Sequence, residues 1–138
     1  FFSEKYGKPA FIKTAEQAYE HFKIIAYAPK EQLRALYLNS RYQIIHDEII
    51  SVGTLTSSIV HPREVFQPAM EYGAVAVIIA HNHPSGSLDP TKADIDTTRQ
   101  LIEAGNILSV ELIDHLIITK HGYVSIMPHI RAINKHNQ

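Results

Sequence analysis

Two histidines and one aspartate are spaced as the ligands of a single metal ion would be. His81 and His83 follow directly on an apolar run at 74–80, and Asp94 comes eleven residues after His83. Side chains at positions i and i+2 of an extended strand point to the same face, so both imidazoles can reach one ion. Asp94 falls in the first turn of the next predicted helix, where free N–H groups and the helix dipole favour a carboxylate. Two imidazoles and a carboxylate, with no thiolate, are typical of a catalytic zinc site that keeps one position open for water.

The elements that must position these residues are those of a layered α/β domain. The apolar run at 74–80 lacks alternation, which is typical of a strand buried on both faces. Gly105 is expected to end the helix that carries Asp94. Mixed helices and strands around two apolar runs, without repeats, predict one domain of the α/β class with α-β-α layers and a mixed central sheet. The predicted helices are 14–27, 62–73 and 92–104, and the predicted strands are 33–38, 42–50, 55–60, 74–80, 110–119 and 123–126.

Composition excludes several classes of protein. The 138 residues include no cysteine, which rules out disulfide scaffolds, iron–sulfur clusters and cysteine nucleophiles. The formal net charge of −1 does not demand a nucleic-acid partner, and no apolar run is long enough to span a membrane. The ends at 1–13 and 129–138 are basic, and we expect them to be solvated tails around a domain at 14–128. Because the chain begins with Phe1, we expect it to be a fragment or a processed product.

The metal-ligand pattern resembles a known family motif. His-x-His-Pro, six residues, a hydroxyl residue (Thr91), two residues and then Asp94 is similar to the JAMM motif of metal-binding MPN-type (JAB-like) peptidase domains. The string His-Asn-His-Pro-Ser-Gly at 81–86 resembles the bacterial RadC branch in particular. Gly-Thr-Leu at 53–55, His-Pro-Arg-Glu at 61–64, Leu-Ile-Asp-His at 112–115 and Tyr-Val-Ser at 123–125 fit that branch as well. The resemblance covers roughly 14–128, but the helix-hairpin-helix region of full-length RadC proteins is missing from the first thirteen residues.

The resemblance implies a fold and roles for further residues. It implies a JAB/MPN-like architecture, comparable with that of cytidine deaminases, and a metallopeptidase activity that uses Zn²⁺ on the three ligands. It assigns the general base to Glu31, just before the first strand, with Glu48 and Glu64 as competing acids. Thr91, where the family usually has serine, would hydrogen-bond the oxyanion or orient the site. The alternative role of Thr91 is the N-cap of the helix that bears Asp94, and Asp114 with His115 is expected to form a locally satisfied buried pair.

Three readings of the function follow. The first is a zinc-dependent hydrolase of a peptide, isopeptide or related amide bond, in a bacterial or phage protein of the cytoplasm. The second is a DNA-repair or recombination module that binds nucleic acid, as the RadC name implies, and the third is a metal-free scaffold. A nuclease named after the letters His-Asn-His has those residues dispersed rather than consecutive, and a zinc deaminase needs a Cys-x-x-Cys pair that this chain lacks. The substrate and the oligomeric state are not encoded in any motif of the chain.

Overall fold

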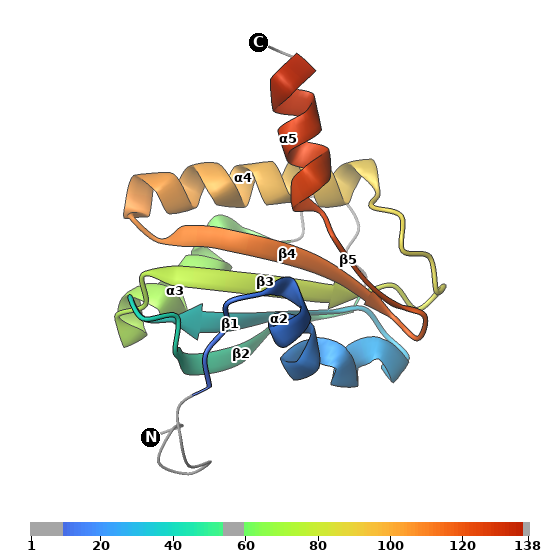
Figure 1. The fold of residues 1–138 in the computed structure, drawn as a ribbon, viewed down its shortest axis with the longest axis horizontal. Coiled ribbons are helices and arrows are strands. Elements are labelled where there is room, and N and C mark those ends of the chain that lie inside the picture. Colours follow the sequence, from blue (N-terminus) through green and yellow to red (C-terminus); the bar gives the residue numbers. More distant parts are fainter. Residues whose placement is uncertain (1–9, 54–59, 137–138) are drawn as a thin grey trace.

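The computed structural model describes residues 10–53 and 60–136, and the side chains as far as Arg131. Its centre is one sheet of five strands in the order β2-β1-β3-β4-β5 (Figure 1). β3 and β4 are parallel, whereas the other neighbouring pairs are antiparallel. The predicted mixed central sheet of an α/β domain is therefore confirmed. The strands are β1 (Gln32–Leu38), β2 (Ile44–Val52), β3 (Ala76–Asn82), β4 (Glu111–Thr119) and β5 (Gly122–Ser125).

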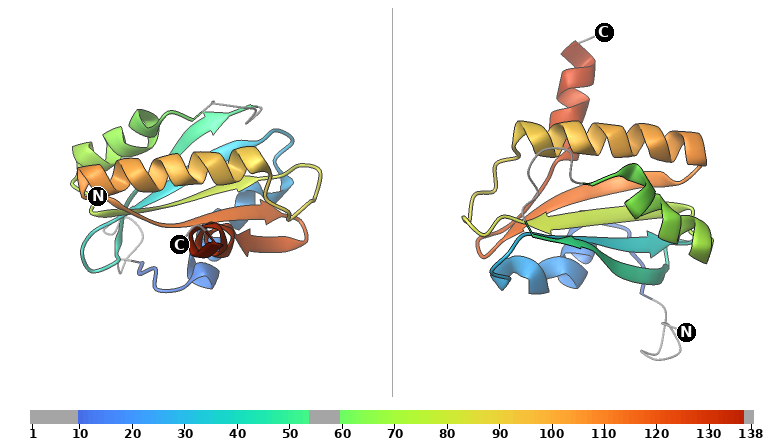
Figure 2. Two further views of the ribbon diagram at one scale, coloured as in Figure 1. Left: turned by 90° about the horizontal axis from the view of Figure 1, so that it is seen from above. Right: turned by 180° about the vertical axis from the view of Figure 1, so that it is seen from behind.

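Helices cover both faces of this sheet, as Figure 2 shows. α3 and α4 pack on one face, and α2 with the short 3₁₀ helix η1 packs on the other. β3 separates two hydrophobic cores, because Val77 and Ile79 point to the α3 side whereas Ile78 and Ala80 point to the α2 side. This explains its unbroken apolar sequence. The helices are α2 (Ala15–Phe22), η1 (Lys23–Tyr27), α3 (Pro62–Tyr72), α4 (Lys92–Leu108) and α5 (Met127–His136).

Local signals in the sequence set several helix ends. The side chain of Thr14 accepts a hydrogen bond from the backbone N–H of Gln17, whose side chain accepts from the backbone N–H of Thr14 in return. α3 starts at Pro62 and ends before Gly73, which has the left-handed conformation of a helix stop at φ 70°. None of the helices in the described part of the chain is long and apolar enough to cross a membrane.

The predicted end of the helix at 92–104 was wrong. α4 continues through Gly105 to Leu108 and ends at Ser109, which takes the left-handed conformation at φ 59°. Gly105 is needed for close packing instead of a helix stop. A Cβ at this position would overlap the carbonyl oxygen of Val110 and lie 3.1 Å from the ring of Phe66. The glycine thus lets α4 lie against both the start of the next strand and α3.

Parts of the predicted tails are ordered. Ile12 is buried, its N–H donates to the carbonyl of Tyr42, and the carbonyl of Ala10 accepts from Ile44, so residues 10–13 extend the edge of the sheet. At the other end, residues 127–136 form α5 instead of an irregular tail, with Ile130 packed in a small apolar cluster. Both segments were predicted to be solvated because each carries a net positive charge. Most of the strand predicted at 55–60 lies outside the described residues.

Candidate metal centre

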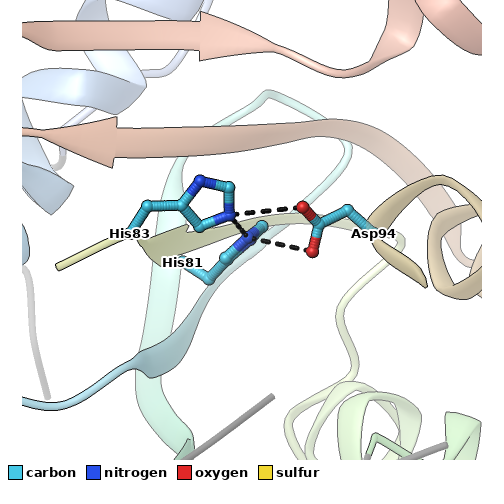
Figure 3. Close-up of side chains that lie close together, drawn as sticks. All are labelled: His81, His83 and Asp94. Atoms are coloured by element: carbon cyan, nitrogen blue, oxygen red, sulfur yellow. Dashed lines mark hydrogen bonds and ion pairs between the residues drawn. The ribbon is translucent and has the colours of Figure 1, made fainter. Parts of the chain in front are cut away.

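The candidate site lies where β3 ends and α4 begins. β3, α4 and β4 form a unit in which two parallel strands are joined by a helix that crosses back over the sheet. In such units the carboxyl end of a strand and the N-terminus of the following helix meet, and ligands commonly bind there. His81 is near the end of β3, His83 follows it, and Asp94 is in the first turn of α4. Figure 3 shows the three side chains converging from these elements.

The three side chains meet within the reach of a single ion. The Nε2 atoms of His81 and His83 are 2.9 Å apart. One carboxylate oxygen of Asp94 lies 3.2 Å from the Nε2 of His81, and the other lies 3.2 Å from that of His83. The exposed fractions of the three residues are only 1%, 8% and 8%. These residues form a buried group that could hold a metal ion, and the structure brings them together as the spacing predicts.

A backbone carbonyl determines which nitrogen of His83 faces the group. Nδ1 of His83 lies 2.8 Å from the carbonyl oxygen of Ser87 in the loop that follows β3. A carbonyl oxygen only accepts hydrogen bonds, so Nδ1 carries the proton and Nε2 of the neutral ring has a free lone pair. Metal-binding histidines are typically oriented by an outer hydrogen bond of this kind.

The electrostatics of the group favour a bound positive charge. Burial by itself would raise the pKa of Asp94, but the adjacent imidazoles of His81 and His83 outweigh burial and hold this pKa well below its usual range. Asp94 in turn raises the pKa of His83 above its ordinary value, because its carboxylate would accept a hydrogen bond from the protonated ring, although burial acts in the opposite direction. The carboxylate is therefore ionised, and a cation between the two imidazoles would balance its charge.

Thr91 holds Asp94 in place. Its side-chain oxygen accepts a hydrogen bond from the backbone N–H of Asp94 at 3.0 Å, and its own N–H donates to the Asp94 carboxylate at 2.8 Å. The predicted alternative, an N-cap, is thus what the structure shows. The hydroxyl proton of Thr91 is not used in either of these bonds, so a second role as a donor stays a prediction.

Glu31 lies just outside β1, on the side of the sheet that carries the two histidines. β1 and β3 are antiparallel with Leu33 opposite His81, so Glu31, which precedes β1, comes next to the end of β3 that His83 follows. The charge of Glu31 contributes to the raised pKa of His83, which shows that the two groups are within electrostatic range. Glu31 also borders an open cavity of about 360 Å³ together with Pro84, the residue after His83. Its position is compatible with the predicted general base, and that role stays a prediction.

The two competing acids have other surroundings. Glu48 lies on the edge strand β2 and pairs with His46 at 2.9 Å. Glu64 occupies the first turn of α3, where the helix dipole accounts for a carboxylate. The described contacts connect neither residue with the three grouped side chains.

Asn82 organises the loop that carries Glu31, a role that the sequence reasoning missed. It points to the opposite face from the two histidines that flank it, and it is completely buried. Its Oδ1 accepts from the backbone N–H of Gln32 at 2.6 Å, and its Nδ2 donates to the carbonyls of Lys30 at 3.1 Å and Ala28 at 3.4 Å. A buried amide between two candidate ligands was the available signal, because it must find partners on the other side of the strand.

His115 and Thr98 were also missed as neighbours of the site. Nε2 of His115, on β4, lies 2.7 Å from Nδ1 of His81, and its Nδ1 lies 2.7 Å from Oγ1 of Thr98 on α4. Burial lowers the pKa of His115 well below its ordinary value, so the ring is neutral. The expected local pairing is present, because the Asp114 carboxylate accepts from the backbone N–H of His115. The imidazole itself, however, turns away from Asp114 toward His81.

The comparisons with known proteins agree with this geometry. A protein of Staphylococcus carnosus (strain TM300) named "UPF0758 protein" is 52% identical over 97 residues, which are 70% of this chain and 43% of that protein. A protein of Bacillus cereus (strain AH187) with the same family designation is 46% identical over 100 residues, 72% of this chain and 44% of the relative. The chain therefore spans less than half the length of these relatives. The family model described as "RadC-like JAB domain" matches residues 12–131, and we conclude that the chain belongs to the RadC-like JAB domain family.

Proposed function

We propose that this domain is a metal-dependent hydrolase that cleaves a peptide, isopeptide or related amide bond. The observation that carries the proposal is the buried group of His81, His83 and Asp94, with the outer carbonyl that leaves Nε2 of His83 free. Two imidazoles and one carboxylate fit Zn²⁺ with a fourth position open, whereas a closed structural site has four protein ligands. Membership of the JAB domain family supports the same assignment.

The residues around the group would divide the chemistry between them. His81, His83 and Asp94 would hold the ion, which when bound supplies a Lewis acid and an activated water. Glu31 would take a proton from the attacking water at its carboxylate and return it to the leaving nitrogen. The hydroxyl of Thr91 would donate a hydrogen bond to the oxygen of the substrate carbonyl as negative charge develops on it.

The first test is metal content. The purified chain should bind one equivalent of Zn²⁺ that a chelator removes, and His83→Ala should bind none with comparable affinity. His121→Ala is the matched control, because His121 lies in the turn before β5 and is not part of the group. If wild type and His83→Ala retain the same amount of zinc, the proposed site is wrong.

The second test is turnover. The zinc-loaded chain should cleave members of an internally quenched peptide library or lysine-linked isopeptides, and a chelator should stop the reaction. Glu31→Gln should keep the zinc and lower kcat by about 100-fold or more, because it removes the general base. Glu48→Gln should behave as wild type. Equal rates for Glu31→Gln and wild type would contradict the assignment of the base.

A further inference from the structure

A chain of buried hydrogen bonds joins two of the proposed ligands behind the site. Oγ1 of Thr98 donates to the backbone carbonyl of Asp94 at 2.7 Å and lies 2.7 Å from Nδ1 of His115. On the other side of the His115 ring, Nε2 lies 2.7 Å from Nδ1 of His81. All four residues are buried, with exposed fractions between 0% and 8%. These hydrogen bonds therefore connect β3, β4 and α4 next to the proposed ion.

The direction of every hydrogen bond in this chain is determined by its last acceptor. The carbonyl of Asp94 can only accept, so the single hydroxyl proton of Thr98 is used there. The bond between Thr98 and His115 must then be donated by Nδ1 of the imidazole. A neutral imidazole has one N–H, so Nε2 of His115 is an acceptor and Nδ1 of His81 must donate to it. This leaves Nε2 of His81 without a proton.

The bare nitrogen of His81 points toward the other two ligands. Its Nε2 lies 2.9 Å from Nε2 of His83, which in the neutral ring has no proton either, because the carbonyl of Ser87 holds that proton on Nδ1. Two lone pairs at this separation repel each other, and the ionised carboxylate of Asp94 adds a negative charge beside them. A cation bound between the two nitrogens and the carboxylate removes both penalties. The outer hydrogen bonds thus prepare the site for an ion before it binds.

We propose that Thr98 and His115 are positioning residues for metal binding, which act by fixing the proton of His81 on Nδ1. This inference rests on the proposed metal site but not on the proposed hydrolysis. Without the hydroxyl of Thr98, Nδ1 of His115 loses its acceptor. His115 can then carry its proton on Nε2 and donate it to His81, whose own proton moves to Nε2 and occupies the position of the metal bond. Loss of such outer partners typically weakens metal affinity by about 10- to 100-fold.

The experiment compares threonine variants by Zn²⁺ affinity, measured in competition with a chelating dye. Thr98→Val removes only the hydroxyl and should weaken zinc binding by about 10- to 100-fold. Thr98→Ser keeps the hydroxyl and should restore wild-type affinity. Thr119→Val is the control, because Thr119 is an equally buried threonine on β4 whose hydroxyl accepts from the N–H of His121 instead. This control should bind zinc as wild type does.

A second pair of variants tests the contributions of the two ring nitrogens of His115 to zinc affinity separately. The amide of Gln reaches roughly the position of Nε2 and can still accept from His81, whereas the shorter Asn reaches the position of Nδ1 and contacts only Thr98. His115→Gln should therefore bind zinc more tightly than His115→Asn. In the metal-free protein, ¹⁵N spectra of the histidine rings should show His81 protonated on Nδ1 in wild type, with the proton moved to Nε2 in Thr98→Val.

Each outcome decides between the possibilities. Wild-type affinity for zinc in Thr98→Val would overturn the inference. It would also be overturned if Thr98→Ser or Thr119→Val lost as much zinc affinity as Thr98→Val, because the hydroxyl of residue 98 would then not be the cause. A chain that binds zinc with the expected order of affinities, yet cleaves no amide, would refute the proposed hydrolysis and leave the positioning role supported. A wild-type chain that binds no zinc would refute both.

Discussion

Replacing Asn82 by alanine tests whether the strand that carries the histidines also holds the loop of Glu31. The variant loses two good hydrogen bonds, to the N–H of Gln32 and the carbonyl of Lys30, and one long contact with the carbonyl of Ala28. Each good bond contributes about 1 kcal/mol net, and the two backbone groups left without a partner add a desolvation penalty. We expect the free energy of unfolding to fall by about 2–4 kcal/mol.

The same substitution should separate turnover from metal binding. Asn82 points away from the histidines, so the affinity for Zn²⁺ should not change. The loop with Glu31 loses its attachment, and a misplaced catalytic group typically costs on the order of 100-fold in rate. Urea unfolding, dye competition for zinc and steady-state kinetics on a cleaved peptide would measure the three quantities.

A matched asparagine provides the control. Asn39 also makes three hydrogen bonds that tie a turn together, but this turn connects β1 and β2 away from the site. Asn39→Ala should lower stability and leave kcat unchanged. The reasoning is refuted if Asn39→Ala slows turnover as much as Asn82→Ala does, or if Asn82→Ala loses its zinc.

Three further predictions concern stability. Gly105→Ala should destabilise the fold by about 1–3 kcal/mol in urea unfolding despite its better helix propensity, because the methyl group overlaps the carbonyl of Val110; a more stable variant would contradict this packing. Tyr37→Phe should cost about 1–2 kcal/mol by the same measurement, because the buried carbonyl of Val65 loses the hydroxyl that donates to it at 2.6 Å; an unchanged midpoint would show that the bond contributes nothing. Burial lowers the pKa of His115 below 6.5, so in weak acid the unfolded chain binds a proton at this imidazole and the folded chain does not. The free energy of unfolding of the metal-free protein should therefore fall by up to about 1.4 kcal/mol per pH unit below about pH 6.5. His115→Gln should show a shallower decrease with acid, and equal slopes would refute the assignment.

The sequence predicted that His81, His83 and Asp94 come together because the physical causes are local. The spacing of His81 and His83 fixes their common face once the segment is a strand, and Asp94 follows from a helix start. The sheet and most helix positions were predictable for the same reason, from apolar periodicity and the residues at helix ends. Glu31 was reached only through resemblance, since its place near His83 depends on the antiparallel pairing of β1 and β3.

What the sequence did not predict depends on contacts between distant segments. Thr98 and His115 are seventeen residues apart, and only the crossing of α4 over β4 brings them together. The role of Gly105 likewise comes from the approach of α3 and the start of β4, whereas its position near a helix end suggested a stop signal. The order in the predicted tails was missed because it depends on a few apolar residues. Ile12 and Ile130 are buried, and they anchor segments that look solvated from their charge.

The side chains at the end of β3 point alternately to the two faces of the sheet and so serve two parts of the site. Successive side chains face opposite layers, so the imidazoles reach the α4 layer while the amide between them anchors the loop on the other side. A slip of one residue in the pairing of this strand would reverse all three directions together. Correct pairing of β3 with its neighbours is therefore a condition for both the group of His81, His83 and Asp94 and the loop of Glu31, and the two should form in the same step of folding.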